Sequence, residues 1–385
     1  MTVDRWGMEI GGSPASIEAW NEAWDRFLFF TGDPLELLAD ANEHDDKFVM
    51  GSVMQGVYAV VSGSPLDAPA VRVALERAER RADAPHVDAL RMLAAGDFTD
   101  AARAWAFIAA RERDFAAARF AHDVFLHVGD AGERIAADAE NVGVFRDHPA
   151  ASFVEGMVAF SWNEVGEFAV ATARGEHSLE AEPRDLWARH ALAHVYEDTD
   201  DREAPFPLLE ATADDWQHQD ALALHVWWHL ALRYLAVGRY EDALALHDER
   251  VDDATTPFRL CDMTSLLWRL ELHGRSVGDR WDLIADRWAD VVERHTCGFL
   301  DLHATFAFVR RPDHPGASVW FDGLAARPTG TAEIDDIFEA VAKPLVAAVR
   351  DRDAAALDAL APTLHRIGGS NAQRSIVALT ADAWR

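Results

Sequence analysis

The stretch WWHLALRYLAVGRYEDA, Trp227–Ala243, decides the fold class. Its large and small packing residues recur at the three- and four-residue spacing of one helical face. These residues are Trp227, Leu230, Ala231 and Tyr234. Gly238 is placed to end this helix, and Ala243 is small enough to let a second helix approach closely. The stretch therefore predicts a helical hairpin.

This order of residues (a large residue, Leu and a small residue, an aromatic, a Gly turn, an aromatic, a packing Ala) is the tetratricopeptide pattern. Turns of related form lie near residues 96, 129, 164, 198, 238 and 274, which are 33 to 40 residues apart. The turn near 198 departs from the pattern because Pro205 and Pro207 follow it, and residues after about 295 match poorly.

A single hairpin of this kind cannot bury its own apolar face, so neighbouring hairpins must stack. We therefore expect an all-α fold, a TPR-like α-solenoid of about seven or eight helical hairpins that curls around a central cavity. Residues 1–85 are predicted to be N-terminal capping helices, and residues 86–385 the repeat array with C-terminal helices, all in one continuous domain.

The charge of the chain argues against two classes of partner. Lys and Arg number 36 and Asp and Glu 66 among 385 residues, a formal charge of −30. Such a chain repels both phosphate backbones and anionic membranes, so we expect no nucleic-acid and no membrane partner. Two cysteines are typical of a reducing compartment, and no apolar run is long enough to span a membrane. A soluble, cytoplasmic protein is predicted.

Histidine pairs are the most informative polar residues. His190, His194 and Glu197 are spaced to lie on one helical face, and His225 and His229 form a second pair about one repeat downstream. The two helices are therefore expected to be neighbours. His190 is equally compatible with a packing role, whereas His225 occupies a position that faces the concave groove in such repeats.

The chemistry expected of these side chains is general acid/base catalysis by a histidine that a carboxylate orients. The predicted catalytic residues are His194, His225, His229, His303, Asp301 and Glu197. No metal ligand and no cofactor is predicted. Zinc at the His pairs is the lesser alternative, because the metalloprotease pattern puts Glu directly after the first His, where Ala191 and Val226 stand.

A substrate-binding role is predicted for the string GGSNAQR, Gly368–Arg374, because the planar guanidinium of Arg374 matches a carboxylate. The predicted substrate-binding residues are Arg374, Gln373, Asn371, Trp228 and Asp262. The alternative is local: the two glycines end one helix, and Ser370 or Asn371 caps the next.

Six strings occur in order along the chain, together with FVMG at Phe48–Gly51 and FAHD at Phe120–Asp123. They are AHVYE at Ala193–Glu197, HVWWHLAL at His225–Leu232, LLWRLEL at Leu266–Leu272, SVGDRW at Ser276–Trp281, DLH at Asp301–His303 and GGSNAQR. Over nearly the whole chain, this set resembles the tetratricopeptide repeat protein 38 family. The resemblance implies an α-solenoid and leaves the reaction open.

Two functions are compatible with these residues. In the first, His, Asp and Arg side chains line an internal pocket that binds a small anionic or carbonyl-containing molecule, and acid/base chemistry on that molecule is an open question. The alternative is a protein-interaction scaffold that binds a peptide or partner in the concave groove. The fixed placing of polar residues along the chain favours the first.

Overall fold

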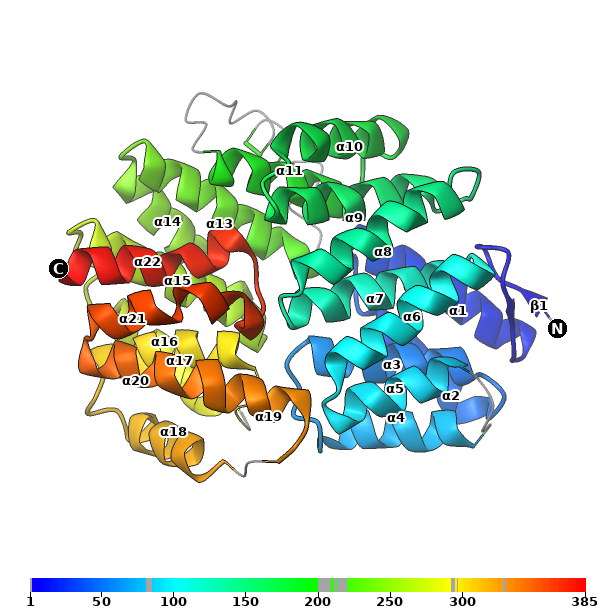
Figure 1. Cartoon of the computed structure of the whole chain (residues 1–385), viewed down its shortest axis with the longest axis horizontal. Coiled ribbons are helices and arrows are strands. Elements are labelled where there is room, and N and C mark those ends of the chain that lie inside the picture. Colours follow the sequence, from blue (N-terminus) through cyan, green and yellow to red (C-terminus); the bar gives the residue numbers. More distant parts are fainter. Residues whose placement is uncertain are drawn as a thin grey trace. The chain divides into compact units, whose positions relative to one another are not determined.

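The structure of the protein is a computed structural model that describes residues 2–80, 85–199, 209–210, 213, 220–291, 295, 297–327 and 330–385. The chain is 77 % helical, and the helices pack in neighbouring pairs (Figure 1). Two short strands, β1 (Thr2–Val3) and β2 (Glu9–Ile10), pair antiparallel at the N-terminus. The all-α class predicted from the sequence is confirmed.

The chain divides into two compact units. The first comprises Met1–Leu126, Asp130–Val195 and Ala211–Ala223, and the second His127–Gly129, Tyr196–Glu210 and Leu224–Arg385. Three helices contain residues of both units: α7 (Phe115–His127), α11 (Leu186–Asp198) and α13 (Asp220–Ala236). The predicted boundary at residue 85 and the single continuous domain stay predictions.

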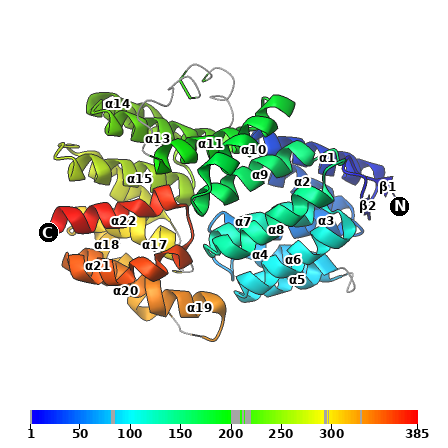
Figure 2. The same cartoon turned by 45° about the horizontal axis from the view of Figure 1, so that its top comes forward.

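The other helices of the first unit pack against their neighbours along the chain, and Figures 1 and 2 both show α9 beside α10. They are α1 (Pro14–Phe29), α2 (Pro34–His44), α3 (Val49–Val61), α4 (Pro69–Glu79), α5 (Pro85–Ala95), α6 (Phe98–Glu112), α8 (Ala131–Val144), α9 (Ala151–Glu164) and α10 (Phe168–Ala181).

The second unit contains the other helices, among which α15 packs against α17 and α22. They are α14 (Tyr240–Arg250), η2 (Val251–Asp253), α15 (Pro257–Leu272), α16 (Arg280–Asp290), α17 (Gly298–Arg310), α18 (Pro315–Ala326), α19 (Glu333–Ile337), η3 (Phe338–Ala342), α20 (Lys343–Asp351), α21 (Ala354–Leu360), η4 (Ala361–Ile367) and α22 (Asn371–Trp384).

The hairpin predicted at Trp227–Ala243 is confirmed: α13 ends at Ala236 and α14 begins at Tyr240. Gly238 joins them with a φ of 77°, a left-handed conformation that glycine adopts without strain. Asp198 ends α11, and the expected turn with Pro205 and Pro207 lies outside the described residues.

Two glycines set the position of α11 in the first unit. A Cβ on Gly156 of α9 would lie 2.9 Å from Asp185 Oδ2 and 3.2 Å from the Cβ of Ala188. A Cβ on Gly175 of α10 would lie 2.8 Å from a methyl carbon of Leu192. Both helices therefore approach α11 too closely for a larger residue.

None of the described helices is both long and apolar enough to cross a bilayer. Cys261 and Cys297 are buried and form no disulfide.

Candidate functional site

Helix α11 carries the first histidine pair and has a buried cap. Asp185 Oδ1 accepts a hydrogen bond from the backbone N–H of Ala188 (3.1 Å), and Asp185 Oδ2 accepts one from Ser178 (2.8 Å). Burial raises the pKa of Asp185 to about 6, although these hydrogen bonds and Arg119 act in the opposite direction. The cap fixes the start of α11 one turn before His190.

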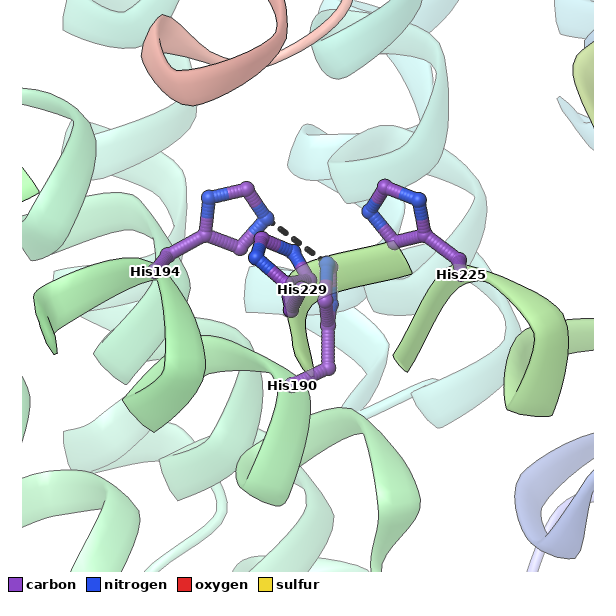
Figure 3. A group of neighbouring side chains, drawn as sticks. All are labelled: His190, His194, His225 and His229. Atoms are coloured by element: carbon purple, nitrogen blue, oxygen red, sulfur yellow. Dashed lines mark hydrogen bonds between the residues drawn. The ribbon is translucent and has the colours of Figure 1, made fainter. Parts of the chain in front are cut away.

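His190 and His194 are one helical turn apart and both are buried. Their Nε2 atoms lie 2.7 Å apart, so one ring donates a hydrogen bond to the other (Figure 3). The ring of Phe160 stacks on His190 with centroids 5.5 Å apart and meets His194 edge-on at 5.2 Å. An apolar wall therefore holds both imidazoles in place.

His225, on α13, is oriented by a buried carboxylate. Its Nδ1 lies 3.0 Å from both oxygens of Asp262 on α15, a residue that is 4 % exposed. Because a carboxylate is an acceptor, Nδ1 carries the proton and Nε2 presents its lone pair. The ring of Trp228 stacks on His225 at 5.1 Å and is itself buried. Asp262, predicted to bind substrate, thus orients a histidine.

His229 lies one turn beyond His225 and is 1 % exposed. Burial lowers its pKa well below the ordinary value, and the nearby charge of Arg269 acts in the same direction. The ring is therefore neutral at physiological pH, which is the state in which histidine binds a metal ion.

The two pairs together form one group, which we call the four-His site: His190, His194, His225 and His229. One ligand atom from each residue lies within 4.8 Å of the corresponding atom of every other member. Figure 3 shows the four rings turned toward one another from α11 and α13. This proximity agrees with the one-repeat spacing of the pairs in the sequence.

Sequence reasoning missed two charged residues near these histidines. Arg269 of α15 is 4 % exposed; burial lowers its pKa to about 10, although the charge of Glu197 acts in the opposite direction. It donates hydrogen bonds to the carbonyl of Ala372 (2.7 Å) and to Ser375 (3.1 Å). Glu164 belongs to a second possible ligand group with His194 and Asp198. In the sequence, Arg269 could have been identified as a candidate because it is a charged residue on an otherwise apolar helical face.

Asp301 and His303, which the sequence placed in the catalytic group, have other partners in the structure. Asp301 Oδ1 accepts a hydrogen bond from Nδ1 of His295 (2.6 Å), so it orients that histidine. His303 Nδ1 donates to the carbonyl of Phe299 (2.8 Å). Burial lowers the pKa of His303 to about 4. Their catalytic role stays a prediction.

The side chains of the GGSNAQR segment (Gly368–Arg374) bond mainly within the segment, as in the helix-capping alternative given above. Ser370 caps α22, and its side chain and that of Gln373 form a reciprocal capping box. The guanidinium of Arg374 donates to the carbonyls of Gly368 and Gly369 and to Asn371 Oδ1. Arg374 and Asn371 also line a cavity of about 270 Å³, and their substrate-binding role stays a prediction.

No family model matches this chain. The resemblance to the tetratricopeptide repeat protein 38 family therefore rests on the quoted strings alone, and the geometry of the side chains carries the functional argument.

Proposed function

We propose that the four-His site binds a divalent transition-metal ion. The observation that supports the proposal is the 4.8 Å limit on the separation of the four ligand atoms. Metal–imidazole bonds of about 2.0–2.1 Å place ligand nitrogens roughly 3–4 Å from one another. Small rotations of the rings would suffice to reach that geometry. Imidazole is a ligand that suits zinc, copper, iron and nickel.

The protonation states favour a cation at this position. The lowered pKa of His229 leaves its ring neutral, so that a metal ion need not displace a proton from it. The Nε2–Nε2 hydrogen bond between His190 and His194 joins two nitrogens that would both turn to the metal ion. One of these two nitrogens carries the proton of that hydrogen bond, and binding of an ion by both would require this proton to leave or to move to the Nδ1 of the same ring.

Asp262 would act as the outer-shell partner of the site. Metal-binding histidines commonly donate their second ring N–H to a carboxylate, which fixes the tautomer and raises the basicity of the ligand nitrogen. The Asp262–His225 hydrogen bond of 3.0 Å has this form. Asp262 and Glu197 also supply negative charge that offsets Arg269 and an incoming cation.

A small anionic or carbonyl-containing molecule is our proposed ligand of the bound ion. An oxygen atom of that molecule would complete the coordination, and the ion would polarise it as a Lewis acid. Any of the four histidines that leaves the metal ion would be available for acid/base chemistry. For the chain as a whole we keep the proposal of a cytoplasmic protein with a TPR-like α-solenoid fold. The packing of the helices in neighbouring pairs supports the solenoid.

The test is metal titration of the purified full chain. After dialysis against a chelator, Co²⁺ is added and the visible absorption of the bound ion is recorded. We expect saturation at one equivalent, and strongly weakened binding in His194→Gln and in His229→Gln. His247→Gln is the matched control, because His247 is equally buried on α14 and stands outside the four-His site.

Circular dichroism of each variant separates lost ligands from lost folding. Absence of saturable Co²⁺ binding by the folded wild-type chain would overturn the proposal. Binding by both site variants that equals that of His247→Gln would overturn it as well.

A further inference from the structure

The ends of helices α9 and α11 carry a second group of metal-ligating side chains, Glu164, His194 and Asp198. One ligand atom from each residue lies within 4.8 Å of the corresponding atom of the other two. His194 also belongs to the four-His site, whereas the two carboxylates do not. The second group therefore differs from the four-His site in its chemistry, because carboxylates supply two of its three ligands.

One face of α9 brings Glu164 to this position. Gly156, Phe160 and Glu164 follow one another at four-residue spacing, so they lie along the same face of the helix. Gly156 packs closely against the start of α11, and the ring of Phe160 meets His194 edge-on at 5.2 Å. On α11, Asp198 follows His194 by four residues and shares its face. The packing of α9 against α11 therefore brings the three side chains together.

The group is largely shielded from solvent. His194 is fully buried, and neither Glu164 nor Asp198 is exposed. A carboxylate that is removed from water loses hydration, and two carboxylates this close together repel each other. A divalent cation that both carboxylates bind would offset both of these costs, because its charge equals the sum of theirs.

Two helix ends add negative potential at the same place. Helix α9 ends at Glu164 and helix α11 ends at Asp198, and neither last turn contains a basic residue. The terminal carbonyl groups of a helix concentrate partial negative charge at its C-terminus, which favours a cation there. The four-His site has no comparable charge among its own ligands, so the second group is the more strongly attractive of the two for a hard cation.

We propose that Glu164, His194 and Asp198 bind Mn²⁺. Carboxylate oxygens suit this hard cation, whereas imidazoles suit zinc, copper and nickel. Metal–ligand bonds of about 2.0–2.2 Å place ligand atoms roughly 3–4 Å apart, which small rotations of the three side chains would reach. A neutral imidazole has one lone pair, so His194 serves one ion at a time, and Co²⁺ in the four-His site leaves only the two carboxylates here. The proposal stands whether or not the four-His site binds an ion.

The experiment is a titration of the chelator-dialysed full chain with Mn²⁺, followed by electron paramagnetic resonance. Free Mn²⁺ gives a sharp signal that broadens on binding, so the spectrum reports the concentration of the free ion. We expect saturable binding by the wild-type chain and at least about tenfold weaker binding in Glu164→Gln and in Asp198→Asn, because each variant loses a charged ligand. Circular dichroism shows whether each variant is folded. Absence of saturable Mn²⁺ binding by the folded wild-type chain would overturn the proposal.

Two control variants distinguish this site from its surroundings. Glu155→Gln changes another carboxylate of α9, which forms an ion pair with Arg174 at 2.9 Å, and should leave Mn²⁺ binding unchanged. His229→Gln removes a ligand of the four-His site alone, so it should weaken Co²⁺ binding and leave Mn²⁺ binding unchanged. Carboxylate variants that bind Mn²⁺ as tightly as Glu155→Gln would contradict the proposal. Loss of Mn²⁺ binding in His229→Gln would place the ion in the four-His site and overturn this inference alone.

Discussion

The hydrogen bond between Asp262 and His225 should control the metal affinity of the four-His site. Asp262→Asn keeps the size of the side chain and removes its charge. Nδ1 of His225 lies 3.0 Å from each carboxylate oxygen, so the wild-type histidine donates to a charged acceptor. Hydrogen bonds to charged acceptors are about twice as strong as neutral ones. Loss of such an outer-shell partner commonly costs about 10–100-fold in metal affinity, or about 1.4–2.7 kcal/mol.

The assay is a competition titration in which the protein and a chromophoric chelator share Co²⁺, because this reports dissociation constants directly. Asp301→Asn is the matched control: Asp301 is equally buried and accepts a hydrogen bond from His295, which lies outside the four-His site. We expect a weaker dissociation constant in Asp262→Asn and no change in Asp301→Asn. A dissociation constant for Asp262→Asn within twofold of wild type would refute the outer-shell role. Equal weakening in both variants would show that lost stability causes the effect.

Two further predictions concern the support of α11. Gly156→Ala should lower the free energy of unfolding by about 1–3 kcal/mol, because the added Cβ would meet Asp185 Oδ2 at 2.9 Å; an unchanged urea midpoint would contradict this reasoning. The pKa of Asp185 is about 6 in the folded chain and 3.8 ordinarily, so its protonated form stabilises the fold. That contribution is complete below about pH 4 and is lost as the pH rises through about 6. Asp185→Asn, which keeps a capping oxygen, should therefore flatten the pH dependence of unfolding between pH 4 and 6, and an unaltered slope would exclude Asp185 as its source.

Patterns that depend on helical spacing could be read from the sequence. The hairpin around Gly238 was predictable because glycine marks a left-handed turn and the flanking residues have helical periodicity. The His190–His194 and His225–His229 pairs were predictable for the same reason. Asp262 was predicted to bind substrate, whereas the structure pairs it with His225, 37 residues away.

Pairings that depend on local backbone geometry could not be predicted. Arg374 is held by carbonyl groups that the positive φ angles of Gly368 and Gly369 turn toward it, and no spacing rule describes such a turn. His303 bonds to a backbone carbonyl one turn earlier, whereas sequence reasoning considered only side-chain partners for it. A pattern of residue types contains no information on which backbone carbonyls need a donor.

The cost of burying four imidazoles links the proposed metal site to the stability of the chain. Buried polar rings among residues such as Phe160 and Trp228 lower stability unless their nitrogens are satisfied. The His190–His194 and His225–Asp262 hydrogen bonds satisfy some of these nitrogens. A bound ion would satisfy the ligand nitrogens together, and binding to the folded chain alone would add about 2.7 kcal/mol of stability when the free ion exceeds its dissociation constant a hundredfold. A group of histidines that serves only packing gains nothing from the ion, so stabilisation by Co²⁺ that is absent in His229→Gln separates the two roles.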